Sequence, residues 1–386
     1  EFLRFIVHQA AAFAVLLPLA GSVLVTLAGR KNAHLAWPLT IISLSFANLA
    51  AVVSLVNVVA VQGGEVRYRF GGWAPPFGIE YRIDHLSALV VVVVLVVGLL
   101  NAITARTRVA AEVPGKEPFF YTLYLLLVAG LCGIVFTNDA FNLYVLIEIT
   151  SLTSYALIAM GNRRASLSSF NYVIMGTIGA SFYLLGVGYL YIKTGTLNMD
   201  GMRAVMEEQN LFGDSSITVA FVLILVGVWI KMAFFPLHGW MPNAYTYAPT
   251  PVGTLMAPLM TKVMVYVMLR VILFVFGADY TFSDSGWSNL VTWLSVLAIV
   301  AGSMVALART DIKKMLTYLI VAEVGYRVGG AWLGNVLGVV GAAYALLSDA
   351  AMSLWGFVAA ARVGVGAGGG GVRAGAGGVR AVRVAW

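Results

Sequence analysis

The sequence predicts an all-α membrane protein with about eleven spanning helices, and three observations support this class. Of the 386 residues, 60% are hydrophobic and only 11% are charged, whereas soluble domains usually carry about 25% charged residues. The mean hydropathy is +0.90. Apolar segments of about 20 residues, which can cross ~30 Å of hydrocarbon, recur along the chain. We therefore expect one continuous transmembrane domain over residues 1–361.

The apolar segments define the expected helices in order. Six are expected at residues 5–27, 36–60, 85–105, 119–137, 140–161 and 168–192. Five more are expected at 216–236, 250–276, 287–308, 314–333 and 336–361. The first segment lacks a basic flank followed by a small-residue cleavage site, so we interpret it as a spanning helix rather than a secretory signal.

The charges in the loops predict an orientation in a bacterial inner membrane. Odd-numbered loops are basic and contain Arg30, Arg106, Arg163 and Arg309, each near further lysines or arginines. Even-numbered loops are acidic or mixed. Because basic residues resist translocation, the basic loops are expected in the cytoplasm and the N-terminus on the outer face.

Two loops carry further structural signals. Between the second and third segments, residues Gly63 to Ile83 alternate apolar and polar side chains around Gly-Gly and Pro-Pro turns, which predicts a β-hairpin; an irregular polar loop is the alternative. At the end of the seventh segment, Pro236 and Pro242 each remove a backbone donor and disfavour helix in the preceding residue. They predict a broken seventh helix, which usually lines a cavity; an ordinary helix end is the alternative.

Ionisable residues within the predicted spans are the main functional signal. A charge at the centre of a spanning helix costs at least ~2.5 to 3.5 kcal/mol, so each one requires a buried partner or water. Glu148 and Lys231 each lie alone on their own segment and must find a partner across the bundle. Forming or breaking such a pair would change how strongly the lysine holds its proton. The alternative is a static bridge between helices.

Later segments repeat this pattern. Lys262 lies near the middle of its segment, and its proton exchange with Lys231 would require water because the two lysines are on separate helices. Glu323 and Arg327 have the spacing of a helical ion pair, and a pair that only permits insertion is the alternative to a proton relay. Asp349 lies in the last segment. His238 lies in the proline-flanked break, where a relay to the cytoplasm and a hydrogen-bonding role are both open.

Other chemistry is excluded by the motifs that the sequence lacks. There is no phosphate-binding glycine loop, no CxxC, no HExxH, and no His or Cys cluster, so we expect no cofactor and no metal. The net charge of +7 does not indicate nucleic-acid binding, because four of these charges lie in the last 25 residues. Residues 362–386 are almost entirely Gly, Ala, Val and Arg, which predicts a disordered tail. This tail has the composition of a frameshifted or damaged gene end, and a genuine flexible tail is the alternative.

With these residues the chain resembles the antiporter-like subunit family shared by respiratory complex I, membrane-bound hydrogenases and Mrp-type multisubunit sodium/proton antiporters. Three stretches carry the resemblance: Phe141 to Glu148, Lys231 through Pro242 to Lys262, and Thr310 to Tyr318. The sequence around Glu148 is most similar to that of the D subunit of Mrp-type antiporters. The resemblance implies that Glu148 pairs with Lys231 of the broken helix and that Lys262 is the central relay.

The chain also departs from the family pattern. Many relatives have histidine or glutamine where Glu323 lies, and histidine where Asp349 lies; both acids could still carry protons. The family usually has about fourteen spans in two inverted five-helix repeats, so the resemblance implies one complete repeat and a truncated second one. The second broken helix and its lysine are missing from this sequence.

Three hypotheses about function follow. The first is the D subunit of an Mrp-type antiporter within a hetero-oligomer, exchanging sodium for protons, with Glu148 and Lys231 gating Lys262. Glu323, Asp349 and His238 would extend this relay. The second is a proton-pumping membrane subunit of an NADH:quinone oxidoreductase or hydrogenase, whose redox chemistry would occur in other subunits. The third is a truncated, inactive product.

Overall fold

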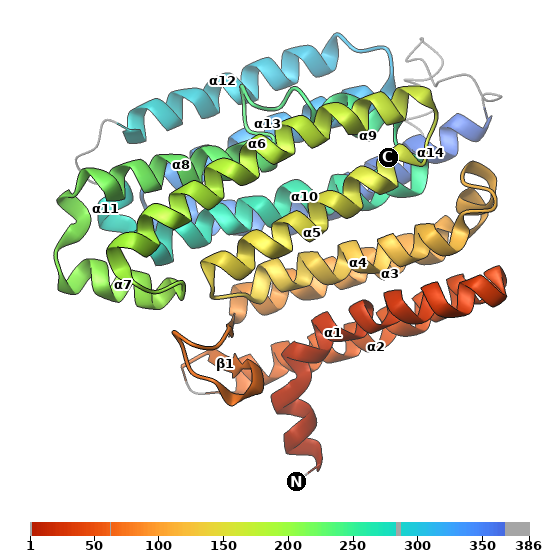
Figure 1. Cartoon of the computed structure of the whole chain (residues 1–386). Helices are drawn as coiled ribbons and strands as arrows, with labels where there is room; N and C mark the ends of the chain where they lie inside the picture. The colour runs from red at the N-terminus through yellow and green to blue at the C-terminus, as the bar shows by residue number, and fades with distance from the viewer. Residues whose placement is uncertain (1, 62, 283–286, 367–386) are drawn as a thin grey trace.

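The computed structural model describes residues 2–61, 63–282 and 287–366. Long helices lie side by side in a bundle, with the only β-strands of the described ranges at one end (Figure 1). The long helices are α1 (Phe2–Lys31), α2 (Ala36–Ala60), α3 (His85–Glu112), α4 (Glu117–Phe136), α5 (Ala140–Ala159), α6 (Arg163–Thr194), α8 (Ser215–Lys231), α10 (Thr250–Arg270), α12 (Trp287–Leu307), α13 (Ile312–Trp332) and α14 (Val336–Gly366). The short ones are α7 (Met199–Glu208), α9 (Met241–Tyr247) and α11 (Ala278–Phe282).

All eleven predicted segments contain a helix. Within the described part of the chain, nine helices are long and apolar enough to cross a membrane. The other two are α8, which has 17 residues, and α13, which contains the charges of Lys313, Lys314, Glu323 and Arg327. α14 continues to Gly366, so the first residues of the predicted tail are helical because they extend an established helix. The rest of the predicted tail, residues 367–386, lies outside the described residues.

Polar side chains fix where many helices begin. Their oxygens accept hydrogen bonds from otherwise unpaired N–H groups of the first helical turn. The helices α3, α5, α6, α7, α8 and α13 are capped in this way by Asp84, Asp139, Asn162, Asn198, Asp214 and Asp311. Three of these capped helices, α5, α8 and α13, carry Glu148, Lys231 and Arg327.

The junction between α6 and α8 is held by an ion pair. Lys193 near the end of α6 donates a 2.5 Å hydrogen bond to Asp214, the cap of α8. This bond, followed by the backbone hydrogen bond from Ser216, lowers the pKa of Asp214 to about 2. The stabilisation from the carboxylate is therefore fully present above about pH 4 and is lost only as pH falls through about 2.

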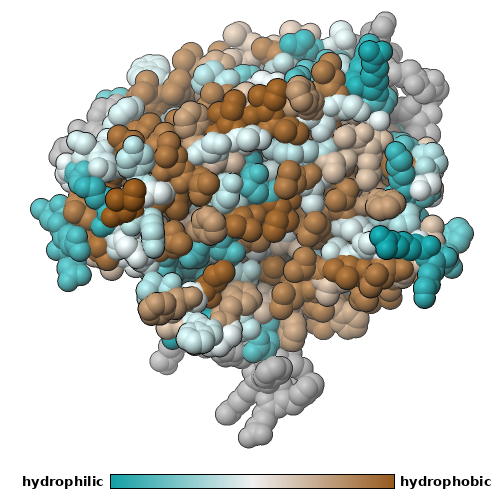
Figure 2. Space-filling model, viewed as in Figure 1, coloured by the Kyte–Doolittle hydropathy of each residue, from teal (hydrophilic) through white to brown (hydrophobic). Residues whose placement is uncertain are grey.

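The centre of the bundle is α10. Each residue from Thr250 to Leu269 is buried, and α10 packs against α3, α4, α8, α13 and α14. In contrast, apolar side chains are exposed on peripheral helices, for example Trp293 and Leu307 of α12. Figure 2 shows bands of hydrophobic residues on the visible face of the bundle. Apolar surface of this kind suits lipid as the solvent, and the chain is a multi-pass membrane protein.

The predicted β-hairpin is present at the end of the bundle that also carries α7. Its strands β1 (Glu65–Arg69) and β2 (Glu80–Asp84) are antiparallel, with Tyr68 opposite Tyr81. The connection turns at Gly71 and Gly72, both at positive φ, which glycine adopts without steric cost. Arg82 pairs with Asp200 of α7 at 2.8 Å, so the hairpin is fastened to the bundle.

Glu80 allows a test of how the hairpin is held. Its carboxylate is buried and accepts hydrogen bonds from Arg67 at 3.1 Å and Arg69 at 3.0 Å. Both arginines are substantially exposed, so we expect Glu80→Ala to speed amide hydrogen exchange in the two strands only about two- to tenfold, or ~0.5 to 1.4 kcal/mol. Glu207→Ala, which removes an exposed partner of Arg203, is the control. Equal exchange in the two variants would contradict the assignment.

The predicted break in the seventh span is confirmed. α8 ends at Lys231, Ala233 adopts φ +57°, and helical structure resumes only at Met241 in α9. Proline cannot donate a helical hydrogen bond, and Pro236 lies in the middle of this irregular stretch. Lys231 is therefore the last residue of a helix that stops inside the bundle.

Candidate functional site

Glu148 and Lys231 meet across the bundle. Lys231 Nζ lies 3.4 Å from Glu148 Oε1 on α5 and donates a 2.7 Å hydrogen bond to Ser151 Oγ, almost one turn further along α5. The lysine side chain is 4% exposed and the glutamate side chain 26%. Ser151 in turn donates to the Ile147 carbonyl. The lysine thus has one charged and one neutral partner, and the charged contact is the longer one.

A glycine makes room for this lysine. A Cβ atom at Gly176 of α6 would lie 1.9 Å from Tyr155 Oη and 3.5 Å from Lys231 Nζ. Small residues let helices approach closely inside membranes. Gly176 was not predicted from the sequence, since nothing distinguishes it from the other glycines of this chain before the helices are placed.

Lys262 lies in a second cluster. Its Nζ lies 3.0 Å from Glu323 Oε2 of α13, and it donates hydrogen bonds to Ser353 Oγ at 2.7 Å and to the Ala257 carbonyl at 3.1 Å. Lys262 is buried. The pairing with Glu323 and the contact with Ser353 were not predicted, because the sequence shows that these groups are buried but not which helices face each other.

Arg327 connects the two acids of the second cluster. Its side chain is fully buried, pairs with Glu323 at 3.2 Å as its i,i+4 spacing predicts, and also donates to Asp349 of α14. Its Nε and Nη1 have no hydrogen-bond partner among the described residues. Arg327 thus joins Asp349 to Glu323 and, through Glu323, to Lys262.

His238 lies in the break but outside both clusters. Its ring stacks on Phe235, with 5.5 Å between centroids, and makes an edge-to-face contact with Tyr318, with 6.2 Å between centroids. Its Nδ1 is buried without a hydrogen-bond partner in the described part of the chain. Among the hydrogen bonds of the described residues, none joins His238 to Lys231 or Lys262.

Two further hydroxyl groups, on Ser154 and Thr261, lie on helices of the two lysine clusters. Ser154 Oγ of α5 lies 3.9 Å from Met260 Sδ of α10. At this point α5, which carries Glu148, approaches α10, which carries Lys262. Thr261, beside Lys262, is fully buried, and its hydroxyl has no hydrogen-bond partner within the described ranges. Such a hydroxyl is a natural partner for water.

Metal binding has no support in the described residues. They contain no group of three or more His, Cys, Asp or Glu side chains that could hold a metal ion. The buried acids are instead engaged by lysine and arginine.

The bundle, its broken helix and its two lysine clusters define a polytopic membrane subunit of the antiporter-like class. Residues 137–366 match the family described as NADH:quinone oxidoreductase/Mrp antiporter, transmembrane region. The match covers more than half of the chain, and the chain belongs to this family.

Individual relatives come from both branches of the family. The chain is 42% identical over 329 residues to the N subunit of the NADH-quinone oxidoreductase of Desulforudis audaxviator, covering 84% of this chain and 65% of that protein. It is 31% identical over 338 residues to the D subunit of the Na⁺/H⁺ antiporter of Bacillus subtilis, covering 87% and 66%. The chain thus spans slightly less than two thirds of the length of these relatives.

Solved structures agree on the fold. A chain of the archaeal membrane-bound sulfane sulfur reductase superposes with a TM-score of 0.86 at 31% identity, over 95% of this chain and 73% of that one. A chain of the Mrp complex from Dietzia gives a TM-score of 0.80 at 25% identity, over 92% and 64%. A chain of complex I from Thermus thermophilus, at 22% identity, shares the fold with a TM-score of 0.68.

Proposed function

We propose that this chain is the proton-translocating subunit of a multisubunit antiporter that exchanges monovalent cations, sodium above all, for protons. The observation that carries the proposal is the presence of two buried lysines, Lys231 and Lys262, each paired with a carboxylate from another helix. Buried charges in membrane proteins are costly and mark ion or proton pathways. Two such pairs on neighbouring helices form a candidate relay.

The mechanism follows from how each pair controls its lysine. A nearby carboxylate favours the protonated ammonium, and burial opposes it. When Glu148 moves away from Lys231, the lysine holds its proton less strongly and releases it towards Lys262. The 3.4 Å separation and the alternative partner Ser151 make this contact easier to open than the 3.0 Å contact of Lys262 with Glu323.

The remaining predicted residues have supporting roles. Glu323 would set the proton affinity of Lys262, and Asp349 would adjust Glu323 through Arg327. His238 would exchange protons between the break and the basic end of the bundle, where Arg163 and Arg309 lie. We assign this end to the cytoplasm of a bacterial cell and the N-terminus to the outer face of the inner membrane.

The chain would work as one transmembrane domain, residues 1–361, within a hetero-oligomer. The relatives in the Mrp and sulfane sulfur reductase structures are chains of membrane complexes. We propose the same for this chain, with lipid and other membrane subunits around it and with neither redox cofactor nor nucleic acid bound to it.

A second candidate function rests on a specific observation. The 42% identity to the N subunit of an NADH-quinone oxidoreductase exceeds the 31% identity to the D subunit of an antiporter. This difference favours a proton-pumping subunit of an NADH-quinone oxidoreductase, which would use the same lysines but draw energy from electron transfer in other subunits.

Proton flux in sealed vesicles with the complete complex separates the candidates. A sodium pulse without an electron donor should produce proton movement in an antiporter, whereas a redox-driven pump should respond only to the donor. Absence of proton movement under both conditions would overturn both functions. Genes for Mrp-type or quinone-reductase partners beside this gene would give independent support to one candidate.

Glu148→Gln tests the gating role directly. Removing the charge while keeping the shape should lower the rate of proton translocation by roughly tenfold, or ~1.4 kcal/mol in the barrier, because Lys231 then loses its charged partner. The initial rate of vesicle acidification measures this effect. Glu117→Gln at the start of α4, away from both clusters, is the control, and equal rates in the two variants would contradict the gating role.

A further inference from the structure

The packing interface between α3 and α10, which we call the seam, has polar groups at both ends and apolar groups in the middle. The two helices are antiparallel, because Asn101 of α3 meets Thr254 near the start of α10, whereas Asp84 before α3 meets Arg270 at the end of α10. Thr254, Lys262 and Arg270 are eight residues apart in turn. At 3.6 residues per turn, this spacing turns each side chain by about 80° from the one before, so the three residues mark successive levels of α10 rather than one face.

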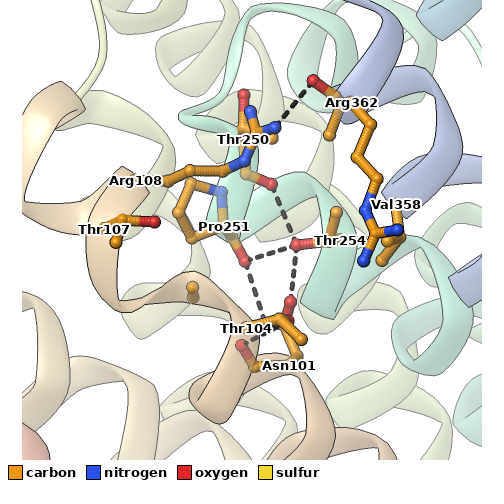
Figure 3. A pocket seen from close by; sticks show the side chains of 11 residues that line it. Asn101, Thr104, Thr107, Arg108, Thr250, Pro251, Thr254, Val358 and Arg362 are labelled. Atoms are coloured by element: carbon orange, nitrogen blue, oxygen red, sulfur yellow. Dashed lines mark hydrogen bonds between the residues drawn. The ribbon is translucent and has the colours of Figure 1, made fainter. Parts of the chain in front are cut away.

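A polar cavity of about 220 Å³ lies at the Thr254 end (Figure 3). Its lining includes Asn101, Thr104, Arg108, Thr250, Thr254 and Arg362. At its floor the Thr254 hydroxyl donates to Asn101 Oδ1 at 2.6 Å, and Asn101 Nδ2 donates to the Pro251 carbonyl at 3.1 Å. A cavity with this many hydroxyl, amide and guanidinium groups has the partners that ordered water requires.

A second, apolar cavity of about 10 Å³ lies beside Lys262. Val90, Val93 and Val94 of α3 line it, together with Pro258 of α10 and two leucines of α14. It provides about the volume of a single water molecule. Two helical turns, or ~12 Å, separate Thr254 from Lys262, and the Lys262 ammonium points back towards the cavity end, where it donates to the Ala257 carbonyl.

The other end of the seam is closed by charges. Arg270 Nη2 lies 2.6 Å from Asp84 Oδ2, and Arg270 Nε donates to Tyr266 Oη at 2.6 Å. Tyr266 Oη donates in turn to the Val135 carbonyl of α4 at 2.9 Å. Arg270 and Tyr266, which fill this end, are therefore held by Asp84 at the end of β2, by each other on α10, and by the Val135 carbonyl of α4.

We propose that this seam is a gated water route to Lys262, entered from the polar cavity at the Arg108 end. Val93 and Val94 form its gate, since an apolar constriction closes a pore by excluding water, and the Asp84–Arg270 pair closes its far end. The route is separate from the broken helix. Its purpose, delivering protons to Lys262, rests on the proposed function, but the water route itself can be tested without transport.

Single cysteines can map this route, because Cys132 is the only cysteine of the chain. In a Cys132→Ala background, a membrane-impermeant methanethiosulfonate would be applied to the full chain in right-side-out and inside-out vesicles. This reagent reacts with thiolates, which form readily only in contact with water. Thr254→Cys should react from the Arg108 side alone, and Val90→Cys should react slowly.

Opening the gate should raise the reaction rate of a cysteine at position 90 and leave the rate at the adjacent position 91 unchanged. Val94→Ser should raise the reaction rate of Val90→Cys by about tenfold or more, because it brings water to the thiol. It should not raise the rate of Val91→Cys, the adjacent buried position outside the cavity. Val94→Ala replaces Val94→Ser if the hydroxyl prevents folding. Likewise, Asp84→Asn should make Tyr266→Cys reactive from the hairpin side.

The results that overturn the route are equally definite. They are an unreactive Thr254→Cys, reaction of Thr254→Cys from the hairpin side, or equal rates at Val90→Cys and Val91→Cys after the gate is altered. None of these readouts depends on proton flux. A chain that shows the predicted accessibility but transports no protons would overturn the proposed function and leave the route in place.

Discussion

Lys231→Met should abolish proton translocation, with a loss of about a hundredfold or more, corresponding to ~2.7 kcal/mol. Methionine keeps much of the length and bulk of the side chain but carries no proton. The substitution removes the only cation within contact of Glu148 among the described residues. The measurement is the initial rate of acidification in vesicles that contain the complete complex.

The matched control for this variant is Lys193→Met. Lys193 also pairs with a carboxylate, Asp214, but it lies at the end of α6 with a side chain 35% exposed. Its loss should change the rate by less than about twofold, since exposed ion pairs contribute little to stability. Comparable rates for the two variants would contradict a special role for Lys231.

Arg327→Met should destabilise the folded chain by ~3 to 5 kcal/mol, because it leaves the buried Asp349 without its cation. Asp349 would lose the arginine that contacts it, whereas Glu323 would keep Lys262. Thermal unfolding of the purified chain in lipid nanodiscs, together with the yield in membranes, measures this effect. The double variant Arg327→Met/Asp349→Asn should recover a large part of the loss, since it removes the orphaned charge.

Arg203→Met provides the comparison for Arg327→Met. Arg203 pairs with Glu207 at the same i,i+4 spacing as Arg327 with Glu323, but on exposed surface, where such a pair contributes ~0.3 to 0.5 kcal/mol. If Arg327→Met unfolded at the same temperature as Arg203→Met, Arg327 would not be needed to neutralise the second cluster.

The fold was largely predictable because the membrane imposes simple rules on sequence. All eleven apolar segments contain a helix, and the two strands of the hairpin flank the predicted turns. The short helices α7, α9 and α11 were missed, since they have 10, 7 and 5 residues and carry no spanning-length signal. The end of α14 was placed too early because its last residues are small and lack apolar periodicity.

The candidate site was predictable only where a charge had no local partner. Glu148 and Lys231 each required a partner on another helix, and the structure brings them together. Arg327, by contrast, had a local partner in Glu323, and this spacing concealed its second contact with Asp349. Ser151, Ser353 and Gly176 gave no signal, because their importance arises only from which helices pack together.

The charge balance of the second cluster has a further consequence. Its four ionisable groups are two bases, Lys262 and Arg327, and two acids, Glu323 and Asp349, so the cluster is electrically neutral when all four are ionised. A proton that enters or leaves gives the cluster a net charge in a medium of low dielectric constant, which is costly. The cluster becomes neutral again only when a second positive charge compensates: it must leave after a proton enters, or enter after a proton leaves. Under the proposed function, this arrangement favours strict exchange over leakage.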